Sequence, residues 1–233
     1  MEKKIKSKTK IKIIGMGRFG TLLASIIKKH FPNAILVDKI EEADIVFPCV
    51  PIRAFEEVIK EISPKLKNGA LVIDVCSVKV HPVKVMKKHL PKHVQIIASH
   101  PLFGPDSAKN GLAGLKIMLW NVSAKKSTFN KIQTSCRKLN LQIIEITPEE
   151  HDKFMAFSLA YTHFIGRIGK DMKIMSTPID TEGFKQTLKI QQYVVNDSEE
   201  LFIDMHRFNP FSDAMRKKFI EAVIKLDNKI NLG

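Results

Sequence analysis

The residues Ile13-Ile14-Gly15-Met16-Gly17-Arg18-Phe19-Gly20 carry the strongest fold signal in the chain. An apolar, strand-like run leads into the first glycine, and a helix-like pattern follows the third. In this context Gly15 permits a tight turn, Gly17 lets the backbone approach a pyrophosphate, and Gly20 lets helix and strand pack closely. The spacing therefore predicts a dinucleotide-binding turn, with an ordinary glycine turn as the alternative.

Asp38 supports the nucleotide interpretation. It ends the second expected strand, 18 residues after Gly20, where a carboxylate can accept hydrogen bonds from ribose hydroxyls and repel a 2′-phosphate. This favours NAD over NADP, although Lys39 and Arg18 could serve a phosphate instead. A strand cap is the simpler alternative for Asp38. The residues expected at the cofactor are Gly15, Met16, Gly17, Arg18, Phe19, Gly20, Asp38, Val50 and Ser77.

Short β-branched runs alternate with amphipathic segments between Ile11 and Ile146. Continuous apolar runs separated by helical segments are typical of a parallel sheet covered on both faces. We therefore predict an α/β fold, a Rossmann-type doubly wound parallel sheet. The interval between Asp38 and Asp44 is too short for the usual helix, so that edge of the sheet should be trimmed. The expected strands are Ile11–Gly15, Ala34–Asp38, Asp44–Pro48, Ala70–Val75, Val94–Ala98, Leu115–Trp120 and Leu141–Ile146.

A second, helical domain is expected after the sheet. The segment Thr147-Pro148-Glu149-Glu150 is typical of a helix start, with Thr147 as N-cap and Pro148 in the first turn. Helical periodicity without a strand pattern continues to Asn231. We place a dinucleotide-binding domain at residues 1–146 and a smaller all-helical domain, for substrate binding and dimerisation, at residues 147–233. Since a small helical domain often completes its core through a second subunit, a homodimer through this domain is expected.

The charge of the chain is strongly positive, with 38 Lys and Arg residues against 24 Asp and Glu residues. Only six of the basic residues are arginines, which do most base-edge and bidentate phosphate recognition, so we expect a lysine-rich solvated surface and no nucleic-acid partner. Three widely spaced cysteines indicate neither a disulfide framework nor a metal site, and they predict a reducing compartment. The basic start, Met1 to Lys12, is not followed by the apolar core (h-region) of a signal peptide, and no run approaches the ~20 apolar residues that span a bilayer. We expect a soluble, cytoplasmic protein without a membrane partner.

Two polar side chains follow expected strands at the edge of the sheet where ligands bind. Ser77 follows the fourth strand and His100 follows the fifth, and loops at the carboxyl ends of parallel strands line the ligand crevice. Capping of the next helix is the alternative role for Ser77. A lone histidine is more often a packed or surface residue, but His100 lies at a strand end beside Pro101 and near Gly104. Both residues are therefore candidates for catalysis.

Five motifs follow one another along both expected domains. They are the glycine fingerprint, Cys76-Ser77-Val78-Lys79, Ser99-His100-Pro101-Leu102-Phe103-Gly104-Pro105-Asp106-Ser107, Glu150-His151-Asp152 and Thr162-His163-Phe164. In this order they resemble the prephenate and arogenate dehydrogenase family of tyrosine biosynthesis, and the resemblance covers the chain from Ile11 to about Phe219. Two further stretches, Lys109–Leu115 and Ser176–Phe184, look most like the plant-type arogenate branch.

The resemblance implies an oxidoreductase that uses NAD or NADP to decarboxylate arogenate, prephenate or both oxidatively. C4 of a cyclohexadienyl ring would lose a hydride to the nicotinamide while C1 loses carbon dioxide. His100 would accept the proton of the C4 hydroxyl, a task that suits a neutral imidazole near neutral pH. Ser77 would help to hold the hydroxyl and the imidazole. His163 matches the second-domain histidine that contacts substrate.

The far end of the substrate is expected in the helical domain. Asp152 and His163 are eleven residues apart, about 20° around an α-helix and roughly 16 Å along it, so they would share one face. They could then hold opposite ends of a substrate. Asp152 would receive the ammonium of arogenate, with a simple ion pair as the alternative. His151 lies about 100° around the helix from Asp152 and is expected to be structural.

One position departs from the family pattern. Thr181 occupies the place nearest to an arginine that clamps a substrate carboxylate in bacterial prephenate enzymes of the family, which weakens the case for prephenate. Lys185, Arg207, Arg216 or a residue of a partner subunit could supply the missing cation. Asp38 is a second departure, since the plant-type enzymes generally resemble NADP users.

Two alternative functions stay open. Another two-domain NAD-dependent hydroxy-acid dehydrogenase would share the fold, but many of those rely on a lysine in the helical domain. A non-catalytic nicotinamide-binding module would bind nucleotide, with Ser77 and His100 intact, and turn over neither substrate.

Overall fold

The computed structural model describes residues 8–231 of the 233-residue chain. The chain divides into two compact units, Met1–Pro148 and Glu149–Gly233, and each is described by itself. This division lies two residues beyond the predicted domain limit. Residues 1–7 of the basic N-terminal segment lie outside the described residues.

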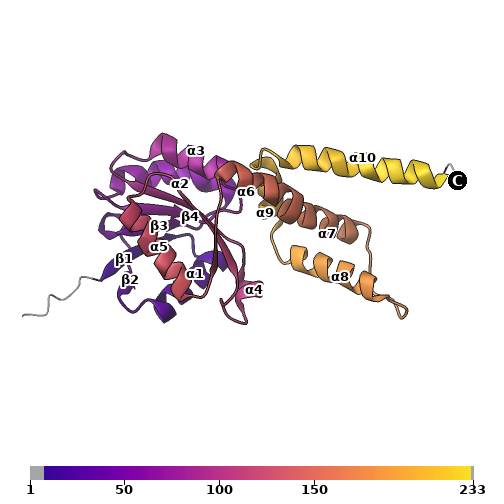
Figure 1. Ribbon diagram of the computed structural model, residues 1–233, viewed down its shortest axis with the longest axis horizontal. Coiled ribbons are helices and arrows are strands. Elements are labelled where there is room, and N and C mark those ends of the chain that lie inside the picture. The colour runs from indigo at the N-terminus through magenta and orange to yellow at the C-terminus, as the bar shows by residue number, and fades with distance from the viewer. Residues whose placement is uncertain (1–7, 232–233) are drawn as a thin grey trace, which may run out of the picture. The chain divides into compact units, whose positions relative to one another are not determined.

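The first unit is built on one seven-stranded sheet with the order β2-β1-β3-β4-β5-β6-β7 (Figure 1). Every expected strand is present near its predicted position, which confirms the Rossmann-type α/β fold class. The strands are β1 (Thr9–Ile14), β2 (Ala34–Leu36), β3 (Ile45–Pro48), β4 (Leu71–Asp74), β5 (Gln95–Pro101), β6 (Lys116–Asn121) and β7 (Gln142–Glu145).

One pair of neighbouring strands departs from the predicted parallel arrangement. β6 runs antiparallel to β5, with His100 opposite Met118, while the other neighbouring strands pair in parallel. A parallel connection needs a crossover element, usually a full helix, but the β5–β6 connection holds only the one-turn helix α4 (Pro105–Ala108). The chain therefore turns back beside β5.

Helices cover both faces of the sheet. Figure 1 shows α2 (Phe55–Ile62) and α3 (Val80–His89) on one side, with α1 (Arg18–His30) and α5 (Lys126–Lys138) on the other. Only the short 3₁₀ turn η1 (Ile40–Glu42) connects β2 to β3, so the predicted trimmed edge is confirmed. Two further 3₁₀ turns flank α2, η2 (Ile52–Ala54) and η3 (Ser63–Lys65).

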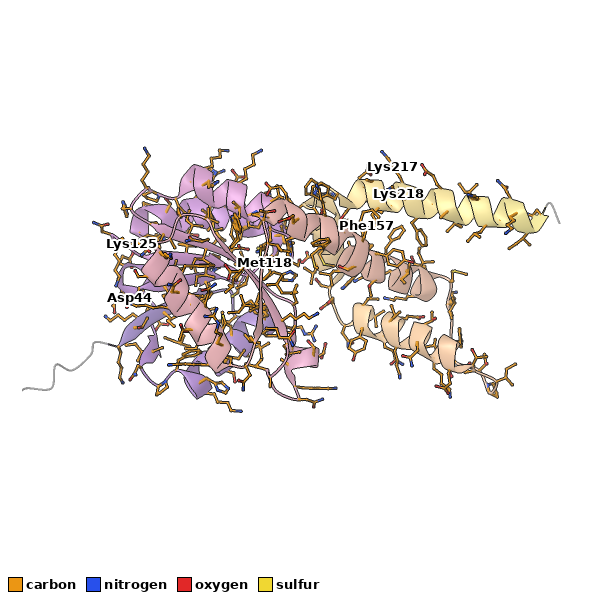
Figure 2. All side chains as sticks on the ribbon, in the orientation of Figure 1. Asp44, Met118, Lys125, Phe157, Lys217 and Lys218 are labelled. Carbon is orange, nitrogen blue, oxygen red and sulfur yellow. The ribbon has the colours of Figure 1, made fainter. Side chains whose placement is uncertain are left out.

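The centre of the sheet is buried on both faces, which explains its continuous apolar runs. All four residues of β4 are buried. Met118 of β6, which is labelled in Figure 2, has no exposed surface. Full burial of one such apolar side chain contributes roughly 1.5–3 kcal/mol. The strands that carry Ser77 and His100 toward the sheet edge therefore start from a fully buried layer.

The second unit is helical, as predicted, and residues 149–231 contain no strand. No helix among the described residues combines the length and apolarity needed to cross a bilayer. A π-helical segment, η4 (Ala156–Ala160), separates the first two helices. The helices are α6 (Pro148–Met155), α7 (Tyr161–Asp171), α8 (Glu182–Val195), α9 (Glu199–Arg207) and α10 (Ser212–Asn231).

Within this unit α7 lies between α8 and α10 (Figure 1). α8 approaches closely because a glycine faces it: a Cβ at Gly166 would stand 2.4 Å from Cγ2 of Val194. On α10, Phe219 packs edge-on against Phe164 of α7, with 5.4 Å between the ring centroids. Glycines therefore allow α7 to pack closely against α8, and aromatic edge contacts join α7 to α10.

Candidate active site

The glycine fingerprint forms the turn between β1 and α1, at the point where the strand order reverses. β2 lies on one side of β1 and β3 on the other, and ligands of such sheets bind at the carboxyl end of this reversal. Gly15 has a φ of +90°, and a Cβ there would stand 2.3 Å from the carbonyl oxygen of Cys49. Val50 borders the same turn, since its Cγ1 would lie 3.2 Å from that Cβ. The turn itself therefore requires Gly15.

Gly20 and Gly17 are explained differently. A Cβ at Gly20 would stand 2.0 Å from the carbonyl oxygen of Gly15, so Gly20 lets α1 start directly against the turn. Gly17 has a φ of −69°, and apart from its own chain neighbours no described residue has an atom within 4 Å of its Cβ position. Open space over Gly17 at the N-terminus of a long helix is what a pyrophosphate needs. The residues present thus fit a bound dinucleotide.

The other residues expected at the cofactor lie around this turn. Met16 and Arg18 are exposed, Phe19 is half-buried, and the first turn of α1 holds no acidic residue. The Arg18 guanidinium donates to Asp106 Oδ2 at 2.7 Å, which joins the glycine turn to α4. Asp38 is exposed two residues beyond β2. Because β2 pairs in parallel with β1, Asp38 lies at the same edge of the sheet as the glycine turn.

Ser77 lies in the loop between β4 and α3. Its Oγ atom is buried and has no hydrogen-bond partner among residues 8–231. Leaving a buried hydroxyl unpaired costs roughly 1–3 kcal/mol, so this atom is available to a ligand. The alternative role as a helix cap is wrong, because Lys79 occupies the N-cap of α3 and no side chain caps it.

His100 lies inside β5 rather than after it. The sequence predicted that the strand would end at Ala98, but the reversed β6 pairs with the extension to Pro101. The imidazole is buried, with 7% of the residue exposed. Asp74 pairs with Ala98 across β4 and β5, so Ser77 and His100 lie three and two residues beyond one common pair, on strands about 4.8 Å apart. The structure therefore brings both expected catalytic residues to the same edge.

In the helical unit, His163 lies on α7 with its side chain buried. Its Nε2 is 3.6 Å from Asp197 Oδ2, whereas its Nδ1 is buried without a hydrogen-bond partner in the described part of the chain. Burial lowers the pKa of His163, against the raising effect of the Asp197 carboxylate. A neutral imidazole with one unpaired nitrogen can hydrogen-bond a ligand, in keeping with its predicted role.

The π-helical segment overturns the predicted relation between Asp152 and His163. The prediction assumed a continuous α-helix, but Ala156–Ala160 adds roughly one residue of rotation, about 100°. The two side chains therefore do not share one helix face. Asp152 has no exposed surface, and its Oδ1 lies 2.8 Å from Nδ1 of His151, so the structure gives it the paired role that was the alternative.

Thr181 and Lys185 lie at the opposite end of α8 from His163. Thr181 is the N-cap of α8 and accepts a hydrogen bond from a backbone N–H of the first turn at 3.3 Å. Lys185 is exposed and forms a 2.6 Å ion pair with Glu182. The residue beside His163, Asp197, follows the far end of this 14-residue helix, which is about 20 Å long. The expected substrate-binding residues thus do not gather at one point of the helical unit, and their role stays a prediction.

Sequence reasoning assigned no role to Lys79 or Asp106, although both lie in motifs that it singled out. Lys79 has no exposed side-chain surface and pairs with Asp74. The valine on each side of it was the only sequence signal of burial. Asp106 pairs with Arg18 across 88 residues of chain, and nothing in the sequence indicated that contact.

A family model matches more than half of the chain. The model described as "Prephenate dehydrogenase, nucleotide-binding domain" matches residues 24–145. A second, described as "TYRAAT1-like, C-terminal domain", matches residues 168–231. The two matches fall on either side of the division between the two units.

Three relatives are similar over most of this chain. Arogenate dehydrogenase 1, chloroplastic, of Arabidopsis thaliana is 28% identical over 96% of this chain and 39% of its own length. Arogenate dehydrogenase 2, chloroplastic, of the same plant is 27% identical, over 88% of this chain and 65% of its own. The probable arogenate/prephenate dehydrogenase of Methanocaldococcus jannaschii is 29% identical, over 79% and 43%. The chain thus spans less than two thirds of each relative.

Solved structures support the fold. Prephenate dehydrogenase from A. aeolicus, in complex with hydroxyphenyl propionate and NAD+, has a TM-score of 0.74 at 20% identity, covering 97% of this chain and 92% of that one. Synechocystis arogenate dehydrogenase has a TM-score of 0.69 at 19% identity, covering 96% and 91%. At these identities the likeness shows the shared fold.

Proposed function

Because the chain belongs to the prephenate dehydrogenase family, we propose that it oxidatively decarboxylates arogenate, prephenate or both with a nicotinamide cofactor. The proposal agrees with the names of its relatives, which are arogenate or arogenate/prephenate dehydrogenases. It also accounts for the motifs that the sequence places in order along both units.

The observation that carries the proposal is the placement of Ser77 and His100. They lie just beyond the common pair Asp74 and Ala98 on neighbouring strands, at the sheet edge that also holds the glycine turn. The buried Ser77 hydroxyl lacks a partner among the described residues. A proton acceptor, an unpaired hydroxyl and a dinucleotide-type turn at one edge are the parts that oxidation of an alcohol requires.

In the proposed reaction His100 accepts the proton of the substrate's ring hydroxyl, and Ser77 Oγ holds that hydroxyl by a hydrogen bond. The bound dinucleotide supplies the hydride acceptor. Loss of carbon dioxide leaves an aromatic ring and provides the driving force. The protein therefore has mainly to orient the reacting groups.

Arogenate and NAD are the preferred pair in this proposal. Thr181 caps α8 at the position where the family pattern would place a carboxylate-binding arginine, which weakens the case for prephenate. Asp38 is exposed beyond β2 at the edge of the glycine turn. Its carboxylate would accept hydrogen bonds from ribose hydroxyls and repel a 2′-phosphate.

We further propose a homodimer formed through the helical unit. Five apolar residues of α10 are between 49% and 78% exposed, more apolar surface than a solvated helix usually presents. Light scattering of the wild type should give twice the mass of one chain. Ile224→Lys should reduce the measured mass to that of a single chain. The apolar residues are Ile220, Val223, Ile224, Leu226 and Ile230.

The proposed compartment is the cytoplasm, although both Arabidopsis relatives are named chloroplastic.

The test is a matrix of initial rates with arogenate and prephenate against NAD and NADP. We expect turnover with at least one substrate and the highest rate with arogenate and NAD. Replacing His100 with Asn should lower kcat by roughly 10²–10⁴-fold, the usual contribution of a positioned base. Replacing Ser77 with Ala should lower it about tenfold, the effect of one lost hydrogen bond.

The matched control is His93→Asn, because His93 is exposed in the loop before β5. Its kcat should equal that of the wild type. Full activity in His100→Asn would refute the assigned base. A wild type that binds NAD but turns over neither substrate would refute the proposed activity and favour a nicotinamide-binding module.

A further inference from the structure

A fully buried lysine lies beside the candidate catalytic residues. Lys79 forms the N-cap of α3, two residues after Ser77, and its side chain has no exposed surface. Lysine is almost never fully buried unless it is paired, because an ammonium loses its hydration in the interior. The position therefore needs both a compensating partner and a reason.

Lys79 belongs to a group of four buried hydrogen bonds at the ends of two strands, and it donates two of them. Its Nζ donates to Asp74 Oδ1 and, at 2.5 Å, to the carbonyl oxygen of Ser99. The same Asp74 oxygen accepts from the backbone N–H of Cys76 at 3.0 Å. Ser99 Oγ in turn donates to the carbonyl oxygen of Asp74 at 2.6 Å. The end of β4, the loop after it and β5 are thus tied together by one buried group of bonds.

The backbone explains why such bonds are needed here. β4 ends at Asp74, opposite Ala98, while β5 continues past it and pairs only with the reversed β6. The Ser99 carbonyl lies one residue beyond the last β4–β5 pair, and a buried carbonyl requires a donor. Lys79 supplies that donor in place of a strand. His100 is the next residue along β5.

Stability alone does not account for a buried ion pair. Such pairs often contribute no more than apolar residues of similar volume, because both charges lose their hydration. Burial raises the pKa of Asp74, and the Lys79 ammonium works against that effect. A pair with a large desolvation cost is found at the one loop that carries Ser77, next to the strand that carries His100.

We propose that Lys79 is a positioning residue for the proposed dehydrogenase reaction: through Asp74 and Ser99 it fixes the Ser77 loop and the His100 strand in one register. This inference rests on the proposed function. Lys79 touches neither substrate nor cofactor in this role. Its contribution is the relative placement of the hydroxyl and the imidazole.

The test compares three variants. Lys79→Met leaves the Asp74 carboxylate buried alone, so it should lower the unfolding midpoint as well as kcat. The double variant Asp74→Asn with Lys79→Met removes both charges and keeps an acceptor for the Cys76 N–H. We expect the double variant to recover part of the lost midpoint, because no charge is left buried while the Ser99 carbonyl still lacks its donor. It should keep KM and the NAD dissociation constant within threefold and retain at least a tenfold loss of kcat.

Ser99→Ala is the milder variant, and it keeps both charges while removing the bond from Ser99 Oγ to Asp74. Its matched control is Ser63→Ala, which removes an equivalent hydroxyl-to-carbonyl bond, to His89 at 2.7 Å, at the far end of α3. We expect a twofold to tenfold fall of kcat for Ser99→Ala and none for Ser63→Ala. Equal kcat values in the two serine variants would overturn the proposal.

The readout that does not depend on turnover is the NMR signal of the His100 imidazole, assigned with His100→Asn. It should shift in the double variant and in Ser99→Ala, and stay unchanged in Ser63→Ala. An unchanged signal with wild-type kcat in a folded double variant would show that Lys79 only stabilises the fold. If the wild type turned over neither substrate, the proposed function would fail while the imidazole signal still tested the placement of His100.

Discussion

Replacing the second and third glycines of the fingerprint with alanine should separate cofactor binding from folding. At Gly17 a Cβ meets no described atom within 4 Å, and the φ of −69° suits any residue. Loss of glycine at the N-cap and reduced freedom of the unfolded chain offset each other at roughly 0.5–1 kcal/mol each. Gly17→Ala should therefore leave stability nearly unchanged while its methyl group occupies the space over the turn.

The contrasting change is Gly20→Ala. Alanine is the better helix former by about 1 kcal/mol, but its Cβ would stand 2.0 Å from the carbonyl oxygen of Gly15. Relief requires movement of the backbone of α1, and overpacking of this kind costs about 1–3 kcal/mol or more. Gly20→Ala should thus lower the urea midpoint, whereas Gly17→Ala should not.

Calorimetric titration with NAD+ and urea unfolding measure the two effects on the same samples. We expect at least a tenfold weaker NAD+ affinity for Gly17→Ala, about 1.4 kcal/mol, with a wild-type midpoint. Wild-type affinity in Gly17→Ala would show that no pyrophosphate lies over this turn. An undiminished midpoint in Gly20→Ala would refute the packing argument.

Three further outcomes are expected. Asp38→Ala should weaken NAD binding by about 1.5–3 kcal/mol, roughly 10- to 150-fold, and reduce the preference for NAD over NADP. An unchanged ratio of the NAD and NADP dissociation constants in paired titrations would show that Asp38 does not contact the ribose. Burial, together with the positive charge of Arg216, lowers the pKa of His206 to about 4. As the pH drops from 6.5 to 4, the imidazole therefore gains its proton in the unfolded chain before it does so in the folded chain. The free energy of unfolding should fall by about 3 kcal/mol over this range. Urea unfolding of His206→Gln should show a shallower pH dependence, and identical curves would contradict the assignment. Burial raises the pKa of Cys49 to about 12 and of Cys136 to about 11, so both thiols should resist a thiol reagent at pH 8 until urea unfolds the chain; rapid native labelling would disprove this.

The sequence predicted the sheet well because buried strands and glycine turns leave local patterns. It did not predict the direction of β6, since an apolar run reads the same whichever way the strand points. The reversal depends on how a short connection packs beside β5. The π-helical segment was missed for a related reason, because helical periodicity over Ala156–Ala160 does not distinguish α from π geometry.

In the candidate site too, residues with a local sequence signal were predicted, and residues that depend on contacts distant in sequence were missed. Gly15, Gly20 and Ser77 were recognisable because a turn or a strand end demands particular residues there. Lys79 was not, because a lysine in a loop is normally solvated and its burial depends on Asp74 and on the Ser99 carbonyl. The capping bond of Thr181 was missed for a different reason, because only the expected arginine was considered there although threonine is a common N-cap residue.

Pairing with the reversed strand β6 fixes the backbone around His100 before any ligand binds. His100 belongs to a regular ladder with Met118 opposite it, so its backbone is immobilised when the chain folds. The entropy of fixing that segment is lost once, during folding, and not again at each turnover. His100 is in this sense a preorganised base. The binding of cofactor or substrate has to order other groups of the site, but not the backbone of His100.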